Sequence, residues 1–211
     1  IACAKDGRSF ISQEDVDKSF IKLGIGKEKK SRIVSEHDRK ITAYHEAGHA
    51  ILFHVLPDVG PVHIVSIIPT GSGAGGYTMP ISEKDDMYLT KGKMLQDITV
   101  SLGGRIAESL VLDDITTGAS QDIKQATEQA KAMVTKYGFT KNVGMINYAG
   151  EDEVFVGREI GQSSRGYSED VAKKIDEEVN SIIDSCYERA EEILKENMEV
   201  LHKCAALLLE K

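Results

Sequence analysis

The segment "AYHEAGHAILFH" (residues 43–54) carries two histidines four residues apart, with a glutamate directly after the first. On an α-helix, residues four apart lie about 40° from each other around the axis, so His45 and His49 project from one face, one turn apart. Two imidazole nitrogens at this spacing can share a tetrahedral metal ion, and neutral imidazole suits zinc. The pattern therefore indicates two ligands of a metal site.

Glu46 lies about 100° around the helix from His45, beside the histidine pair and too far round to join it comfortably as a ligand. From there its carboxylate can reach a water molecule that the metal holds and acidifies. The glutamate can take the proton of this water and pass it to the leaving amine of a peptide bond. The HExxH spacing thus predicts Glu46 as the general base of a hydrolytic reaction.

The alternative interpretation of the segment is an amphipathic helix with stray polar residues. The flanking residues are small or apolar nearly all round the helix, namely Ala43, Ala47, Gly48, Ala50, Ile51 and Leu52. A surface helix would be polar on its far side, so we expect this helix to be buried. Buried histidines beside a glutamate need a partner such as a metal ion, which favours the metal site.

A catalytic zinc normally has three protein ligands and keeps its fourth position for water, so a third ligand must come from elsewhere. His54 lies about 140° around the helix from His49 and points away. Val55 occupies the position where metzincins carry a third histidine. Two carboxylates on later helices remain: Glu108 in mid-helix and Asp122 in a first turn, where its charge would also favour the positive helix end. Spacing alone leaves both open.

Composition narrows the function classes. The chain has 211 residues, a formal net charge of −8 and a pI of about 5.3, which argues against a general nucleic-acid binder. Its three cysteines are scattered without a CxxC pair, so a disulfide framework or thiolate zinc site is not expected, and a reducing compartment fits best. No apolar run reaches the roughly 18 residues of a membrane span, so we expect this chain by itself to be soluble.

The hydrophobic periodicity predicts a mainly α (α+β) fold with one small β-sheet. Helices are expected at about 12–23, 38–56, 90–112, 121–137, 168–196 and 198–210, and strands at 62–68 and 75–81. The last two helices share a continuous apolar stripe and predict a long C-terminal helical hairpin. The segment "PTGSGAGG" (69–76) is a flexible connection rather than a phosphate loop, because no GK[ST] closes it and no helix follows.

Five ordered motifs together resemble the peptidase domain of FtsH-type ATP-dependent AAA+ zinc metalloproteases. They are HEAGH at 45–49, "LGGRIAE" at 102–108, "TTGASQDIKQAT" at 116–127, "KYGF" at 136–139 and "YSEDVAKKIDEEV" at 167–179. The resemblance runs from about residue 31 to residue 211. It implies a Zn²⁺ cofactor bound by His45, His49 and Asp122, with Glu46 as the general base. Glu108 then becomes a candidate for orienting a zinc-bound histidine, as outer carboxylates often do.

The resemblance also implies a substrate site. The stretch Gly75, Gly76, Tyr77 and Thr78 corresponds to the edge that family members lay alongside an extended polypeptide, and backbone pairing there would explain broad sequence tolerance. Polypeptides that are unfolded, damaged or embedded in membranes are the implied substrates.

The same resemblance predicts the domain organisation. We expect residues 1–30 to be a remnant of the AAA+ helical lid and its linker, and residues 31–211 to be the zinc metallopeptidase domain. Ile1 opens within a helical pattern, so a longer parent is expected. The parent is implied to be a homo-hexamer whose AAA+ module uses ATP. It is implied to be anchored in the cell membrane, with the peptidase on the cytoplasmic side or its organelle equivalent.

A competing hypothesis is a hexamerisation scaffold whose metal braces the fold without proteolysis. The amphipathic C-terminal helices motivate it, because they could pack between subunits as readily as within one chain.

Overall fold

The computed structural model describes residues 2–5, 7–24, 26, 33–71, 73–81, 87–112, 114–149 and 166–210. The domain boundary expected near residue 30 lies outside these described residues. Within them, the helices are α1 (Ala2–Lys5), α2 (Gln13–Gly24), α3 (Glu36–Val55), α4 (Lys91–Val111), η1 (a 3-10 turn, Thr117–Ala119), α5 (Ser120–Thr135), α6 (Glu169–Glu196) and α7 (Met198–Glu210). The strands are β1 (Val62–Ser66) and β2 (Tyr77–Pro80). This architecture confirms a mainly α fold with a small sheet.

Side-chain caps fix where the main helices begin. Ser35 Oγ accepts a hydrogen bond from the Asp38 backbone N–H at the start of α3 (3.0 Å), and Thr90 Oγ1 accepts one from Lys93 N–H at the start of α4 (3.1 Å). Each cap satisfies one of the free N–H groups of a first helical turn. The helix starts expected at about residues 38 and 90 are therefore correct to within about two residues.

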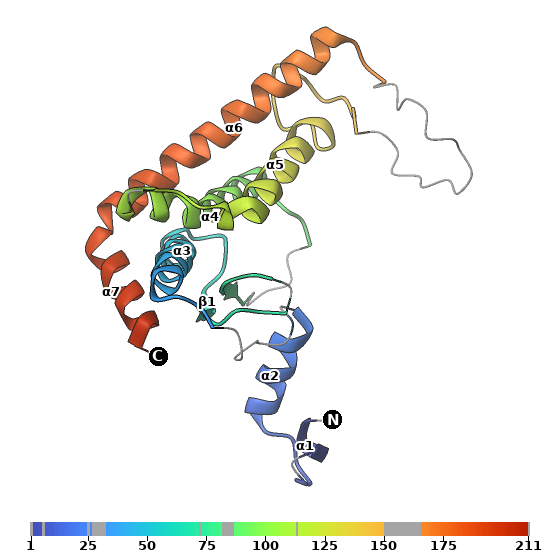
Figure 1. The fold of residues 1–211 in the computed structure, drawn as a ribbon. Helices are drawn as coiled ribbons and strands as arrows, with labels where there is room; N and C mark the ends of the chain where they lie inside the picture. Colours follow the sequence, from blue (N-terminus) through green and yellow to red (C-terminus); the bar gives the residue numbers. More distant parts are fainter. Residues whose placement is uncertain are drawn as a thin grey trace.

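The core is built around α3 and α4, which pack directly on each other. On its other side α4 packs against α5 and the long α6, so it is enclosed between helices (Figure 1). Two glycines let the central pair approach closely: a Cβ at Gly48 would lie 2.6 Å from the Gly103 carbonyl oxygen, and one at Gly103 would lie 2.5 Å from Leu52. Leu52 of α3 and Ile98 and Ile106 of α4 are fully buried.

The sheet lies against α3. β1 and β2 pair antiparallel, with Val65 opposite Thr78 and Ser66 opposite Tyr77, and both strands contact α3 (Figure 1). This packing carries β2 along the helix that bears the histidine pair.

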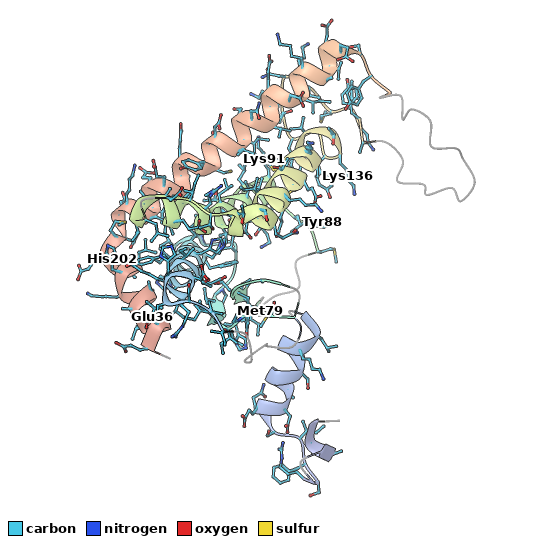
Figure 2. The ribbon with its side chains drawn as sticks, viewed as in Figure 1. Glu36, Met79, Tyr88, Lys91, Lys136 and His202 are labelled. Atoms are coloured by element: carbon cyan, nitrogen blue, oxygen red, sulfur yellow. The ribbon has the colours of Figure 1, made fainter. Side chains whose placement is uncertain are left out.

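The C-terminal helices correct one expectation. α7 packs chiefly on α3 and meets α6 only near their junction, so the expected hairpin, in which α7 would run back along α6, is wrong (Figure 1). The reason is that α7 buries Leu201 and Ala205 in the shared core. In addition, the Nδ1 atom of His202, which is labelled in Figure 2, forms a 2.9 Å hydrogen bond with the Tyr44 hydroxyl of α3. Among the described residues, no helix combines the length and apolar character needed to cross a membrane.

Candidate metal centre

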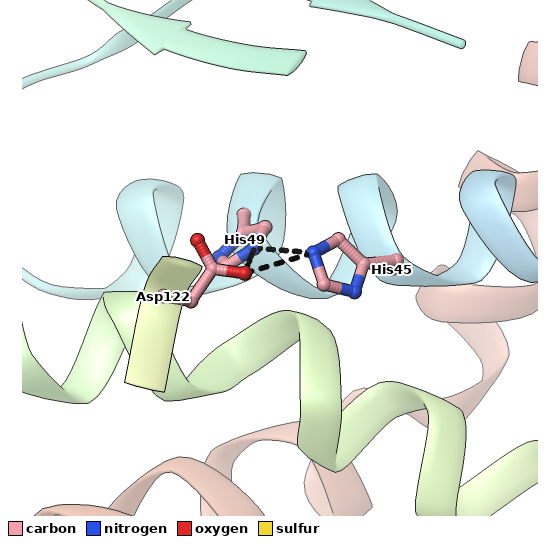
Figure 3. Close-up of side chains that lie close together, drawn as sticks. All are labelled: His45, His49 and Asp122. Atoms are coloured by element: carbon pink, nitrogen blue, oxygen red, sulfur yellow. Dashed lines mark hydrogen bonds and ion pairs between the residues drawn. The ribbon is translucent and has the colours of Figure 1, made fainter. Parts of the chain in front are cut away.

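Three side chains from two helices converge on one point. His45 and His49 project from α3, and Asp122 reaches them from the first turn of α5 (Figure 3). His45 Nε2 lies 3.1 Å from His49 Nε2 and 3.2 Å from Asp122 Oδ2, and His49 Nε2 lies 3.8 Å from the same oxygen. Together they form a group whose ligand atoms could hold a metal ion.

The spacing of these atoms suits zinc. Bonds of about 2.0–2.1 Å to a tetrahedral Zn²⁺ would place neighbouring donor atoms ~3.3 Å apart, close to the distances found here. The tautomer of His49 also fits, because its Nδ1 lies 2.8 Å from the Val100 carbonyl oxygen, which only accepts hydrogen bonds. Nδ1 therefore carries the proton, and the lone pair of neutral His49 Nε2 is left facing His45 and Asp122. A cation at this point would satisfy all three groups.

Glu108 lies behind His45. Its Oε1 accepts a hydrogen bond from His45 Nδ1 at 2.8 Å, and its Oε2 accepts two from Thr116, through the backbone N–H and the hydroxyl, each at 3.0 Å. Of the two carboxylates that spacing left open, the structure thus brings Asp122 to the converging Nε2 atoms. Glu108 contacts the opposite edge of the His45 ring and is 1% exposed.

Glu46 lies beside this cluster. Its side chain is 5% exposed, and its Oε2 accepts a 2.8 Å hydrogen bond from the Thr78 hydroxyl of β2. His54, one and a half turns further along α3, is exposed to solvent and does not belong to the cluster.

The electrostatics of the site follow from burial and hydrogen bonding. Burial lowers the pKa of His49 to about 4, which keeps the imidazole neutral, as a metal ligand must be. Burial also acts to lower the pKa of His45, but hydrogen bonds to Asp122 and Glu108 outweigh it and raise the pKa to about 9. The carboxylates of Asp122 and Glu108 therefore stabilise a positive charge on the His45 ring, which lies between them.

The carboxylates divide into two kinds. Burial raises the pKa of Glu46 to about 7, in the range suited to a general base at neutral pH. Burial acts in the same direction on Glu108 and Asp122, but hydrogen bonds from His45 hold the pKa of each below its usual range. Those two carboxylates stay ionised while Glu46 can exchange a proton.

A groove opens over the cluster. It has a volume of about 1890 Å³, and His45, Glu46, His49 and Asp122 line it together with the segment 74–78. Pockets for small molecules measure roughly 300–1,000 Å³, so this groove has room for a longer ligand. The four residues expected to bind substrate, Gly75 to Thr78, all lie along it, although Gly75 and Gly76 precede the hydrogen-bonded part of β2.

Several groups that shape the site were missed from the sequence. The Val100 carbonyl accepts a hydrogen bond from His49, and Thr116 donates to Glu108. Gly104 lies under His45, where a Cβ would come within 2.4 Å of the ring. The adjacent glycines in "LGGRIAE" were a signal of close approach to a neighbouring helix. Nothing in the local sequence marked the Val100 carbonyl.

A histidine pair on one helix, of which His49 is buried and His45 half-buried, an intervening glutamate and a carboxylate from a second helix define a metallopeptidase of the HExxH type. Comparison with known families agrees: residues 32–211 match Peptidase family M41, and the chain belongs to this family.

Individual relatives are similar over the whole chain. The ATP-dependent zinc metalloprotease FtsH of Caldicellulosiruptor bescii is 50% identical over 100% of this chain and 34% of its own length. FtsH 1 of a Thermoanaerobacter species is 47% identical over 100% of this chain and 34% of its own. FtsH of Veillonella parvula is 44% identical over 100% of this chain and 33% of its own length. The chain thus spans about a third of the length of the curated relatives it matches.

Proposed function

We propose that this chain is the zinc endopeptidase domain of an ATP-dependent protease and cleaves unfolded polypeptides. The observation that carries the proposal is the convergence of His45, His49 and Asp122, with the Glu46 carboxylate beside them. Names of relatives that are 44–50% identical, all of them ATP-dependent zinc metalloproteases, support zinc as the metal.

In this proposal each side chain has a defined task. His45 and His49 bind the zinc through Nε2 and Asp122 binds it through Oδ2, while Glu108 keeps the His45 ring oriented through Nδ1. Zinc bound there would polarise the scissile carbonyl and lower the pKa of a water ligand. Glu46 accepts a proton from the attacking water and delivers it to the leaving amine nitrogen.

The substrate backbone binds along the segment Gly75–Thr78. β2 belongs to a sheet of two strands in the described part of the chain, so one of its edges is available for pairing with an extended peptide. Backbone hydrogen bonds are independent of side-chain identity, so such pairing gives broad sequence tolerance. The position of this segment in the wall of the groove supports the assignment.

For the whole protein we propose the organisation of the FtsH type. Residues 1–30 are the end of an AAA+ helical lid with its linker, and residues 31–211 are the peptidase domain. The family match, which begins at residue 32, supports this division. The parent is a homo-hexamer that uses ATP to deliver unfolded, damaged or membrane proteins. It is anchored in the cell membrane, with the peptidase on the cytoplasmic side or its organelle equivalent.

Metal analysis combined with a cleavage assay tests the proposal. Purified protein should contain about one zinc per chain by elemental analysis, and it should cleave casein in a reaction that a chelator stops. Glu46→Gln should retain the zinc and lose cleavage by about 10²–10⁴-fold, because the proton acceptor is gone. Asp122→Ala should lose the zinc and the activity together.

Matched controls are Glu128→Gln and Asp176→Ala, which change exposed carboxylates on α5 and α6. Both variants should keep the metal content and the activity of the wild-type chain. A zinc-loaded hexamer that leaves casein intact would contradict the enzyme and favour the metal-braced scaffold. Wild-type activity in Glu46→Gln would remove Glu46 from the role of base.

A further inference from the structure

Thr78 joins the sheet to the base of the site. Its hydroxyl lies 2.8 Å from Glu46 Oε2 and 3.2 Å from the Glu46 backbone oxygen. A threonine hydroxyl has one proton to donate, and a charged carboxylate oxygen is a stronger acceptor than a carbonyl that already serves the helix. The side-chain contact, which is also the shorter, is therefore the one that Thr78 makes.

The preceding glycine permits this contact. A Cβ at Gly76 would lie 2.5 Å from the Ser66 carbonyl oxygen and 3.0 Å from Glu46 Cγ, so any larger residue would push this segment away from α3. The pairing of Thr78 with Val65 then fixes the position of Thr78 along α3. The sheet thus holds the hydroxyl at a set distance from the glutamate.

Glu46 depends on such support. Its backbone is fixed in α3, but its side chain has three rotatable bonds. Within the described part of the chain, Thr78 is the residue whose side chain hydrogen-bonds to its carboxylate. Proton transfer requires the carboxylate to lie within hydrogen-bond reach of the reacting water, and a displacement of about 1 Å can cost about 10²-fold in rate.

We propose that Thr78 is a positioning residue that fixes the Glu46 carboxylate for proton transfer through a hydrogen bond from Oγ1 to Oε2. The role rests on the proposed peptidase function. It differs from the expectation that Thr78 only binds substrate, because the side chain acts on Glu46 while the backbone remains available to the peptide.

The test compares Thr78→Val, which removes the hydroxyl at nearly constant shape, with Thr78→Ser, which restores it. In zinc-loaded protein, Thr78→Val should lower kcat for a quenched-fluorescent peptide by about 10–100-fold and leave KM within about twofold. Thr78→Ser should recover kcat to within about threefold of wild type. The zinc content of both variants should match wild type. Thr127→Val is the control, because the Thr127 hydroxyl donates to Ile123 O of its own helix and, among the described residues, makes no other hydrogen bond.

A second measurement does not depend on turnover. Crystal structures of zinc-loaded wild type and Thr78→Val should show one Glu46 rotamer in the first and a displaced or multiple rotamer in the second. An unchanged Glu46 rotamer, an unchanged kcat in Thr78→Val, or a rise in KM alone would overturn the positioning role. If wild type binds zinc but cleaves nothing, the proposed function fails, and the rotamer comparison still decides the contact.

Discussion

At the scale of single residues, the site depends on where two imidazole protons lie. Val100 O accepts the Nδ1 proton of His49, and Glu108 accepts that of His45, so both Nε2 atoms face Asp122. The Val100 carbonyl belongs to the backbone and cannot be removed by mutation, whereas the Glu108 carboxylate can be replaced. A change at Glu108 therefore tests whether the hydrogen bonds behind the histidines support metal binding.

We expect Glu108→Gln to weaken zinc binding by about 10–100-fold while the protein remains folded. The glutamine oxygen can still accept from His45, but its NH₂ group would then face the Thr116 N–H, which is also a donor, so one of the two contacts must be lost. Competition with a chromogenic chelator measures the zinc Kd. Glu128→Gln on the exposed face of α5 should leave the Kd unchanged, and equal affinity in the two variants would contradict the role of Glu108.

At the scale of elements, α4 contributes none of the proposed metal ligands, yet it sets the position of the histidines. It packs on α3 through glycines, and Gly104 leaves the space that the His45 ring occupies. Alanine at 104 would place a methyl group 2.4–2.5 Å from three ring atoms of His45, closer than any real contact, so the ring must move.

Gly104→Ala should therefore lower the zinc affinity by about 100-fold or more, because metal–ligand distances tolerate only about 0.2 Å. Gly92→Ala is the matched control in the same helix, since its nearest non-neighbouring atom, Thr90 Oγ1, would lie 3.9 Å from the new methyl group. Alanine favours helix over glycine by up to about 1 kcal/mol, so this control should not be destabilised. Full zinc affinity in Gly104→Ala would show that α3 can shift without harm to the site.

The elements were predictable to different degrees for physical reasons. The starts of α3 and α4 could be predicted from the local apolar periodicity, and the structure places the caps Ser35 and Thr90 there. Helical spacing alone predicted that His45 and His49 project from one face of the helix. The choice between Asp122 and Glu108 depended on how α5 and η1 pack against α4, and the packing of α7 on α3 depended on the shared core. Periodicity identifies an apolar face but not the element that covers it.

Helix α2, near the N-terminus, offers a pH-dependent test. The Asp15 carboxylate accepts hydrogen bonds from the Arg8 guanidinium at 2.8 and 2.6 Å, and from the Ser12 N–H and hydroxyl at 2.9 Å each. The hydrogen bonds from Arg8, followed by those from Ser12, hold the pKa of Asp15 well below its usual range. Because the folded state favours the ionised form, this stabilisation is complete above the unfolded pKa of about 4 and is lost as the pH falls towards the folded value.

We expect hydrogen-exchange protection factors in α2 to be constant from about pH 7 to pH 5 and to fall below about pH 4. Asp15→Asn removes the titrating group, so its protection should be lower at neutral pH and should change little on acidification. A matching acid-dependent loss in Asp15→Asn would assign the effect to another group.

At the scale of the whole molecule, the metal site joins parts of the fold that are far apart in the chain. α3 and α5 both pack chiefly on α4, and the proposed ligands His45, His49 and Asp122 connect these two helices. A metal held only by the folded arrangement stabilises it by RT ln(1 + [L]/Kd), which is about 4 kcal/mol at a free zinc concentration of 1,000 times the Kd. For a domain of this size each kcal/mol raises Tm by about 2–4 °C, so zinc should raise Tm by about 8–16 °C.

Differential scanning calorimetry of chelator-treated protein, with and without added zinc, measures this shift, and two variants show its origin. Glu46→Gln should keep the full shift, since Glu46 is not a proposed ligand. Asp122→Ala should lose most of it, because the bridge from α5 to α3 is broken while the apolar core is unchanged. If Asp122→Ala kept the shift of wild type, the stabilising zinc would be bound elsewhere, and Asp122 would not be the third ligand.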